Sequence, residues 1–324
     1  MTGSDTSAPA PPAGGDRARI AFLGPEGTFS EQALLTQPDY AAMDLVSCGT
    51  ITDVLHAVTS GAADVGFVPI ENAIEGSVNV TLDALIFDHE LRMQREVVIP
   101  IVMCLLAPLG VGLGDIERVV SIPVATAQCR GFLQDHLPGV EVVAAHSNAE
   151  AARLVRDEHD GHSAAVAPVL AAKIYDLEVL AEDIEDHRGN ETRFVAVTRG
   201  GVAAPTGHDK TTIVVFQRAD RPGSLLSILQ EFAARAINLT RLESRPTKRG
   251  LGDYCFIIDL EGHVGDELVA DALRDLKSKN EDVLFLGSYA AAGETAPRVR
   301  REAEASWAEA NDWVQALRAE VPAD

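Results

Sequence analysis

The run LRMQREVVIPIVMCLLA, residues 91–107, is a long apolar stretch typical of β-structure, and it separates two sets of alternating strand-like and helix-like segments. The first set begins at residue 19 and the second near residue 114. Such alternation predicts parallel sheets with helices on both faces. Because residues 96–107 leave the first set and residues 193–199 return to it, we expect two lobes, with a ligand bound between them at the carboxyl ends of the strands. A single larger sheet would give a similar pattern.

A different order of elements follows the Gly/Pro-rich stretch GGVAAPTGHDK, residues 200–210. It reads strand, helix, strand, strand, helix, strand, which is the βαββαβ order of a ferredoxin-like unit. We therefore expect an α/β protein with two folded domains. The expected segments are a disordered tail at 1–17, the two-lobe domain at 18–200 with its second lobe at about 100–193, a linker at 201–210, the βαββαβ domain at 211–290 and a helical tail at 291–324.

The composition narrows the class of function. Hydrophobic residues make up 46% of the 324 residues and charged residues 23%, which is typical of a soluble globular protein. The net charge of −22 argues against nucleic acid or an anionic membrane as a partner, because their phosphates would be repelled. No run is apolar enough to span a bilayer, residues 1–18 lack the pattern of a secretion signal, and the cysteines have no ligand spacing. We therefore expect a cytoplasmic protein without a metal or other cofactor.

Five motifs occur in order along the chain and together carry a resemblance to a known family. They are GPEGTFSEQAL (24–34), VPIENAIEGSV (68–78), ATAQCRGFL (125–133), IEDHRGNETRF (184–194) and LTRLESRP (239–246). In this order they resemble prephenate dehydratase with a C-terminal ACT regulatory domain, over about residues 18–290. The resemblance implies two α/β lobes like those of a periplasmic binding protein, followed by the ACT unit. Two positions depart from the family pattern, because Ala73 stands where the family usually has Ser and Ile122 where it has His.

The resemblance implies an enzyme of phenylalanine biosynthesis, a hydro-lyase that removes water and carbon dioxide from prephenate to give phenylpyruvate. Thr192 would donate a hydrogen bond to the leaving hydroxyl, aided by a relay from another group because threonine is a weak acid. Arg193 would hold a carboxylate or else form an ion pair with Glu191, Glu185 or Asp186. Phe194 would wall the ring or simply fill the core. Glu71 is the candidate proton reservoir, with a cap or hinge role as the alternative.

The direction of alternate side chains in a strand constrains this triplet. In a regular strand Thr192 and Phe194 share one face and Arg193 points to the other. All three can serve one pocket only if the strand begins at or after Arg193.

Candidate substrate-binding residues lie in the same motifs. Asn72 follows a predicted buried strand, and Gly76 and Ser77 are expected to begin a helix whose N–H groups suit a carboxylate. Thr28 lies in a glycine-containing strand-to-helix turn, for which a turn without a ligand is the alternative. The resemblance adds two residues of the second lobe, Ser121 and Gln128.

In the ACT unit the resemblance implies an allosteric phenylalanine site at an interface between two copies of the chain, which would form a homodimer or homotetramer. Its residues would be Gly223, Ser224, Leu225, Glu243, Ser244, Arg245 and Pro246. Two other readings remain open. One is arogenate dehydratase, whose substrate has an amino group in place of the keto oxygen, and the other is a non-catalytic amino-acid sensor of the same architecture.

Overall fold

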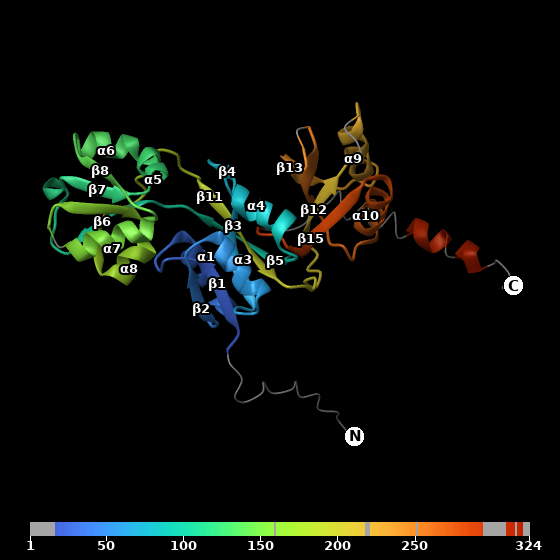
Figure 1. Cartoon of the computed structure of the whole chain (residues 1–324), viewed down its shortest axis with the longest axis horizontal. Coiled ribbons are helices and arrows are strands. Elements are labelled where there is room, and N and C mark those ends of the chain that lie inside the picture. The colour runs from blue at the N-terminus through green and yellow to red at the C-terminus, as the bar shows by residue number, and fades with distance from the viewer. Residues whose placement is uncertain are drawn as a thin grey trace, which may run out of the picture.

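The computed structural model describes residues 17–158, 160–217, 221–250, 252–293, 309–314 and 316–319 (Figure 1). The expected tail at 1–17 lies outside this range except for Arg17. Of the expected helical tail at 291–324, the segments 309–314 and 316–319 are helical, and most of the rest lies outside the described residues.

Lobe 1 contains three parallel strands and the helices that follow them. The strands are β1 (Arg19–Leu23), β2 (Asp44–Cys48) and β3 (Val65–Asn72). The helices and the short strand of this part are α1 (Phe29–Leu35), α2 (Pro38–Ala41), α3 (Ile51–Thr59), β4 (Gly76–Ser77), α4 (Asn79–Asp83) and the π-helix η1 (Ala84–Asp88). Local sequence explains the helix starts: Thr28 and Thr50 are N-caps whose hydroxyls accept hydrogen bonds from the amides of Glu31 and Asp53.

Lobe 2 is built on a separate five-stranded sheet with the order β10-β6-β9-β7-β8. Its strands are β6 (Cys104–Pro108), β7 (Arg118–Ser121), β8 (Glu141–Ala144), β9 (Ser163–Ala167) and β10 (Leu177–Ala181). Its helices are α5 (Pro123–Gln128), α6 (Arg130–His136), α7 (Asn148–Glu158), α8 (Val169–Tyr175) and the 3-10 turn η2 (Leu113–Asp115).

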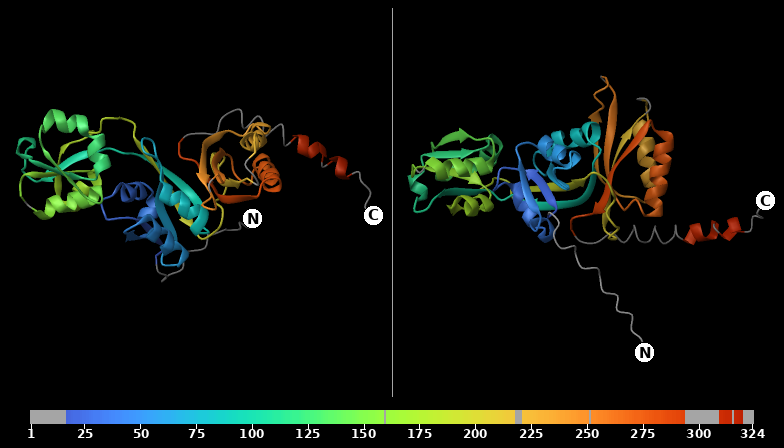
Figure 2. Two further views of the ribbon diagram at one scale, coloured as in Figure 1. Left: turned by 45° about the horizontal axis from the view of Figure 1, so that its top comes forward. Right: turned by 60° about the horizontal axis from the view of Figure 1, so that its bottom comes forward.

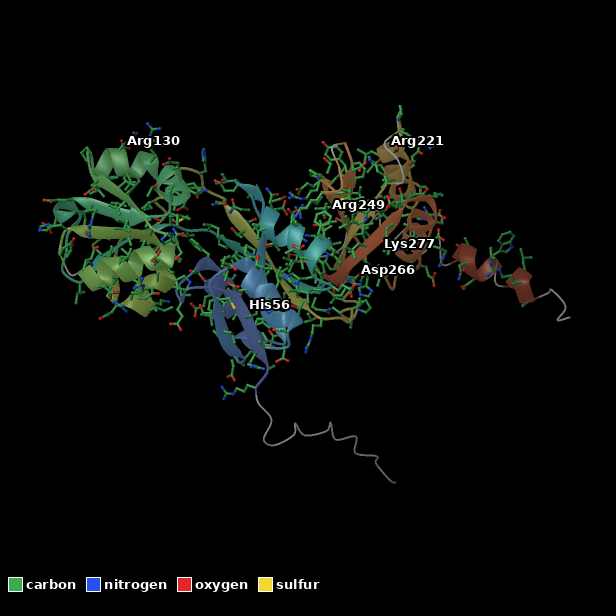
Figure 3. The ribbon with its side chains drawn as sticks, viewed as in Figure 1. His56, Arg130, Arg221, Arg249, Asp266 and Lys277 are labelled. Atoms are coloured by element: carbon green, nitrogen blue, oxygen red, sulfur yellow. The ribbon has the colours of Figure 1, made fainter. Side chains whose placement is uncertain are left out.

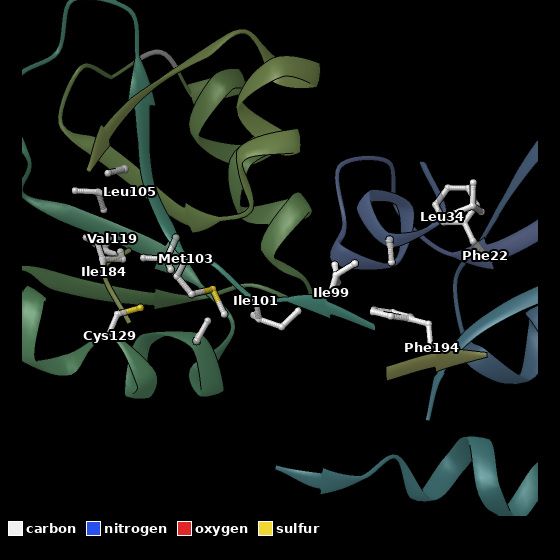
Figure 4. Close-up of a cluster of buried hydrophobic side chains, with 14 of the residues drawn as sticks. Phe22, Leu34, Ile99, Ile101, Met103, Leu105, Val119, Cys129, Ile184 and Phe194 are labelled. Atoms are coloured by element: carbon white, nitrogen blue, oxygen red, sulfur yellow. The ribbon is translucent and has the colours of Figure 1, made fainter. Parts of the chain in front are cut away.

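Two extended segments connect the lobes, as the sequence predicts. One leads from β5 (Arg92–Pro100) to β6, and the other returns from β10 to β11 (Glu191–Thr198). A single hydrophobic cluster follows the first connection, from Phe194 and Ile99 in lobe 1 through Met103 to Cys129 and Ile184 in lobe 2 (Figure 4). The two-lobe prediction is therefore confirmed.

The expectation of purely parallel sheets is wrong. In lobe 1, β11 is antiparallel to both of its neighbours, β3 and β5, and in lobe 2, β6 is antiparallel to both β9 and β10. The physical reason is that these strands belong to the connecting segments. A chain that crosses from one lobe to the other and back enters each sheet against the direction of the strands that alternate with helices.

The C-terminal domain has the predicted βαββαβ order. Its elements are β12 (Asp209–Phe216), α9 (Ser224–Ala233), β13 (Leu239–Pro246), β14 (Tyr254–Glu261), α10 (Glu267–Lys279) and β15 (Asp282–Ala290). Its sheet joins the sheet of lobe 1 through β15 and β5, where Ala290 pairs with Arg95, so that ten strands form one sheet. Gly287 permits this approach, because a Cβ at this residue would lie 2.3 Å from the carbonyl oxygen of Met93.

The two faces of the C-terminal sheet have different partners. Helices α9 and α10 cover one face through a core that includes Ile213, Phe232 and Leu276. The other face contributes Ile257 and Tyr289 to a hydrophobic cluster shared with lobe 1. The C-terminal domain therefore packs directly on lobe 1 (Figure 2, right).

Candidate active site

The Thr-Arg-Phe triplet lies inside strand β11, which begins at Glu191. The strand runs between β3 and β5, with Thr192 opposite Asn72 on one side and Ile99 on the other. The condition under which all three side chains would share a pocket is therefore not met. Thr192 and Phe194 lie on one face of the sheet, and Arg193 lies on the other.

Thr192 and Asn72 form a hydrogen-bonded pair at the end of the two strands nearest lobe 2. The amide nitrogen Nδ2 of Asn72 donates to Thr192 Oγ1 at 2.9 Å and to Asn190 Oδ1 at 2.8 Å. Thr192 is 8% exposed, and its hydroxyl has no acceptor among the residues that the structure describes. Its hydrogen is therefore free to be donated to a ligand.

The side chain of Asn72 is held on both sides. Its Oδ1 accepts hydrogen bonds from the backbone amides of Ile74 and Glu75, each at 2.9 Å. Because its amide hydrogens and its oxygen are all engaged within lobe 1, Asn72 fixes the orientation of the Thr192 hydroxyl.

Two hydrogen bonds link lobe 2 to lobe 1, in addition to the hydrophobic cluster that the lobes share. Gln128, at the end of α5, donates to the carboxylate of Glu75 at 3.1 Å. On α8, the hydroxyl of Tyr175 donates to the carbonyl oxygen of Glu26 at 2.7 Å. Gly27 is needed at the second contact, because a Cβ there would lie 3.1 Å from the Tyr175 ring and 3.2 Å from Ala171.

Two other predicted substrate-binding residues use their hydroxyls within the protein. Thr28 caps α1 and donates to the carbonyl oxygen of Leu23. Ser121 is fully buried at the end of β7, where it donates to the carbonyl of Val166 and accepts from Asn148. Neither hydroxyl points to the Thr192–Asn72 pair in this arrangement.

Phe194 lies in the core. It is 2% exposed and stacks on Phe67, with ring centroids 5.4 Å apart. Cys129 is also buried, and burial raises the pKa of its thiol to about 12, so that it stays protonated at neutral pH. A thiolate nucleophile is therefore not part of this site.

The guanidinium of Arg193 points away from lobe 2 and toward the C-terminal domain. It lies 2.5 Å from the carboxylate of Asp259 and donates to the hydroxyl of Tyr289 at 2.7 Å. Its Nε is 2.7 Å from Glu96 Oε2, a close ion pair that lacks the alignment of a hydrogen bond. Burial disfavours the charged form, but Tyr289, Asp259 and Glu96 keep the pKa of Arg193 above its ordinary value. Arg193 is therefore a buried cation.

The acidic partners expected for Arg193 near the motif were Glu185, Asp186 and Glu191. The structure instead supplies Glu96, Asp259 and Tyr289, which sequence reasoning missed. The available signal was the polar Asp259 inside the apolar strand YCFIIDLEG and the Glu96 that precedes VVIPIV.

Glu71 lies on the same side as Arg193. Its carboxylate is 3.5 Å from the Arg193 guanidinium, and in the ladder Arg193 is opposite Glu71. A bulge follows, because Phe194 is opposite Pro69. Glu71 is thus separated by the sheet from the Thr192 hydroxyl.

The helix expected to begin at Gly76 begins three residues later. Gly76 and Ser77 form β4 instead, paired with β3, and α4 starts at Asn79. The amide of Val78 donates to the Ile70 carbonyl and is not open to an anion. Pairing with β3 extends the chain here, which prevents an earlier helix start.

The residues predicted for the regulatory site fall into two groups. On β13 the side chains alternate, with Ser244 and Pro246 exposed while Glu243 and Arg245 face lobe 1. Glu243 accepts a hydrogen bond from Ser77, and Arg245 pairs with Asp83 at 2.6 Å. At the start of α9, Gly223 has a φ of 87°, Ser224 donates to the carbonyl of Arg221, and Leu225 packs on the domain core.

No group of three or more metal-binding side chains occurs among the described residues. In the same part of the chain, no helix is both long and apolar enough to cross a membrane. A cavity of about 300 Å³ on lobe 2 is lined by residues of α5, α6 and β8. One of them is Arg130 of α6, which is labelled in Figure 3. None of the predicted site residues lines this cavity.

Comparisons with known proteins agree with the motifs. A family model described as "Prephenate dehydratase" matches residues 20–201, and one described as "ACT domain" matches residues 211–278. A prephenate dehydratase of Amycolatopsis methanolica is 44% identical over 308 residues, which cover 93% of this chain and 98% of the relative.

Solved structures give the same picture. A prephenate dehydratase from Arthrobacter aurescens in complex with L-Phe is 42% identical, with a TM-score of 0.85 over 93% of this chain and 99% of the other. A protein described as a quorum-quenching acylase, GqqA, is 30% identical, with a TM-score of 0.75 over 85% of this chain and 98% of the other. With matches over both domains, the chain belongs to the prephenate dehydratase family and carries a C-terminal ACT domain.

Proposed function

We propose that the reaction of this prephenate dehydratase, which converts prephenate into phenylpyruvate, water and carbon dioxide, takes place beside Thr192 and Asn72, where lobe 2 meets lobe 1. The supporting observation is the Thr192 hydroxyl, which accepts from Asn72 and keeps its own hydrogen available. A donor held in this way can stabilise the leaving hydroxyl as the ring becomes aromatic.

Closure of the lobes would complete the site. The contacts of Gln128 with Glu75 and of Tyr175 with Glu26 lie at the lobe junction, so that both depend on the distance between lobes. A closed junction would also exclude water from the substrate carboxylate that leaves as carbon dioxide, since water stabilises that carboxylate more than the transition state.

The ACT domain is proposed to bind L-phenylalanine between two copies of the chain and so inhibit the enzyme in the cytoplasm. In support, β13 is the last strand of the ten-stranded sheet, and it exposes Leu242 beside Ser244 and Pro246. Leu226 of α9 is exposed as well. The structure of the Arthrobacter aurescens relative contains L-Phe.

One assay tests the reaction and its site together. The purified chain is incubated with prephenate and, separately, with arogenate, and formation of phenylpyruvate and phenylalanine is followed. We expect turnover of prephenate, and a decrease in kcat of about 10²-fold or more for Thr192→Val. Thr198→Val, which removes a hydroxyl from the other end of the same strand, should keep the wild-type rate.

Other results would support the alternative functions. Faster turnover of arogenate than of prephenate would identify arogenate as the substrate, and no turnover of either compound would favour a non-catalytic amino-acid sensor. Full activity of Thr192→Val would require another donor. The activity assay and light scattering, each done with and without L-phenylalanine, test the regulatory part. An unchanged rate and an unchanged mass at saturating L-phenylalanine would exclude inhibition through ACT pairing.

A further inference from the structure

A cluster of polar side chains, all buried except the partly exposed Lys210, lies where the ACT domain packs on lobe 1. We call it the Arg193 cluster, and its members are Glu96, Arg193, Lys210, Thr212, Asp259 and Tyr289. They come from strands β5, β11, β12, β14 and β15, so that the cluster spans the boundary between the two domains.

The hydrogen bonds within the cluster are close and mutually supporting. Thr212 donates to Asp259 at 2.7 Å and lies 2.6 Å from the Tyr289 hydroxyl. Lys210 pairs with Glu96 at 2.8 Å. The guanidinium of Arg193 thus contacts the carboxylates of Glu96 and, at 3.5 Å, Glu71 from its own lobe, and two groups from the ACT domain.

The charges of the cluster are already balanced. Two cations, Arg193 and Lys210, face the two buried carboxylates of Glu96 and Asp259. A substrate carboxylate at Arg193 would add another anion beside Glu96 and Asp259, which repel it. The geometry therefore disfavours Arg193 as the residue that binds the substrate.

The position of Arg193 in the ladder suggests a different role. Thr192 and Asn72 face each other across β11 and β3, and the next pair in register is Arg193 and Glu71, on the opposite face. On each strand, therefore, one residue faces the proposed reaction site and its neighbour in sequence faces the ACT domain. A shift of the backbone at Arg193 moves the backbone of Thr192 with it.

We propose that Arg193 is a positioning residue, which holds β11 in the register that presents the Thr192 hydroxyl. In this proposal Asp259 and Tyr289 of the ACT domain bind its guanidinium together with Glu96, and we call these three side chains the socket of Arg193. This inference rests on the proposed function for the role of Thr192. It makes the ACT domain a direct support of the strand that carries the donor, through side chains remote from the exposed face of β13.

Tyr289→Phe tests the inference, because it removes one hydroxyl from the socket and leaves the ring in place. We expect kcat for prephenate to decrease about threefold to tenfold with KM unchanged. The matched control is Ser288→Ala, which removes the hydroxyl of the next residue in β15. Ser288 is equally buried and bonds to Thr211, not to Arg193. The control should keep the wild-type kcat.

A second measurement does not depend on turnover. Amide hydrogen exchange is followed in a peptide covering residues 189–197 of the intact protein. We expect faster exchange in Tyr289→Phe than in Ser288→Ala, because the socket restrains the opening of β11. This comparison still tests the positioning role if the wild-type chain fails to turn over prephenate, a result that would remove the proposed function alone.

The opposite results would overturn the inference. Tyr289→Phe would match Ser288→Ala in both kcat and exchange if the socket had no effect on β11. If Arg193→Lys raised KM more than tenfold at unchanged kcat, Arg193 would be a substrate-binding residue. Thermal unfolding of each variant, done first, shows whether it is folded.

Discussion

Lobe 1 has two neighbours, and the two junctions are built differently. Toward lobe 2 the polar contacts are few, and their hydrogen-bond donors are uncharged. Gln128 donates to Glu75, and Tyr175 donates to Glu26. A hydrophobic cluster crosses each of the two junctions, but toward the ACT domain a shared sheet and buried ion pairs occur as well. We therefore expect lobe 2 to open more easily than the ACT domain separates from lobe 1.

The ACT junction has a second group of charges that supports this view. Arg241 and Ser77 both bond to Glu243, and Arg245 pairs with Asp83. These contacts lie on α4 and β4, directly after Asn72 in the sequence. The ACT domain is thus anchored to lobe 1 on both sides of the strands that carry Thr192 and Asn72.

The largest effect is expected from removing the central cation of the ACT junction. Arg193→Ala leaves Glu96 and Asp259 buried without their shared partner, which should lower the free energy of unfolding by about 3–5 kcal/mol. Urea denaturation measures this quantity. A loss below about 1 kcal/mol would show that the junction is held by its apolar contacts alone.

An intermediate effect is expected at the lobe junction from Gly27→Ala. The new Cβ would press on Tyr175 and Ala171, and Gly27 has a φ of 87°, where a side chain is strained by about 1–2 kcal/mol. Gly139→Ala is the matched control, because Gly139 has a φ of 83° and no atom within 4 Å of its Cβ position. We expect both to lose similar stability, and only Gly27→Ala to lose kcat/KM for prephenate. Equal activity would mean that the lobes need not approach at Gly27.

Acid should weaken the ACT junction next. Burial raises the pKa of Asp259, but Arg193 and Arg241 bring it below its usual value. Because the pKa of Asp259 is lower in the folded than in the unfolded protein, its ionised form stabilises the fold at pH values above the unfolded pKa of about 3.9. This stability is lost as the pH falls through the folded pKa.

The free energy of unfolding should therefore decrease below about pH 4, by at most about 1.4 kcal/mol per pH unit from this group. Denaturation at a series of pH values measures the slope. Asp259→Asn should reduce the slope of the free energy of unfolding against pH. If this variant had the same slope as the wild type, the acid sensitivity would arise from other carboxylates.

The smallest effect is expected from Gln128→Ala. Its single bond to Glu75 lies near the surface, and such a bond contributes about 0.5–1.5 kcal/mol at most. Stability should stay within this range while KM for prephenate rises, because the bond joins the two lobes beside the proposed site. A change in urea stability as large as that of Arg193→Ala would contradict the difference between the junctions.

Much of the fold could be predicted from the sequence. The period of apolar residues gave both α/β sets and the βαββαβ order, and the run at residues 91–107 predicted the connection between lobes. The antiparallel strands were not predicted, since the direction of a connecting segment depends on where the other lobe lies.

The arrangement of the predicted site residues could be foreseen only in part. The motifs suggest Thr192 and Asn72 as site residues, and their side chains meet because their strands pair. They also suggested that Arg193, Glu71 and Ser77 join them, and the structure places these three on the ACT side of the sheet.

The sequence by itself determined the elements, their order and the family, because periodicity and motifs are local properties of the chain. Only the tertiary structure decided which face each motif residue serves. That depends on where β11 begins and on partners such as Asp259 and Tyr289, which are 66 and 96 residues from Arg193. A one-residue change in strand register reverses every side chain, so no reading of the triplet alone could place Arg193.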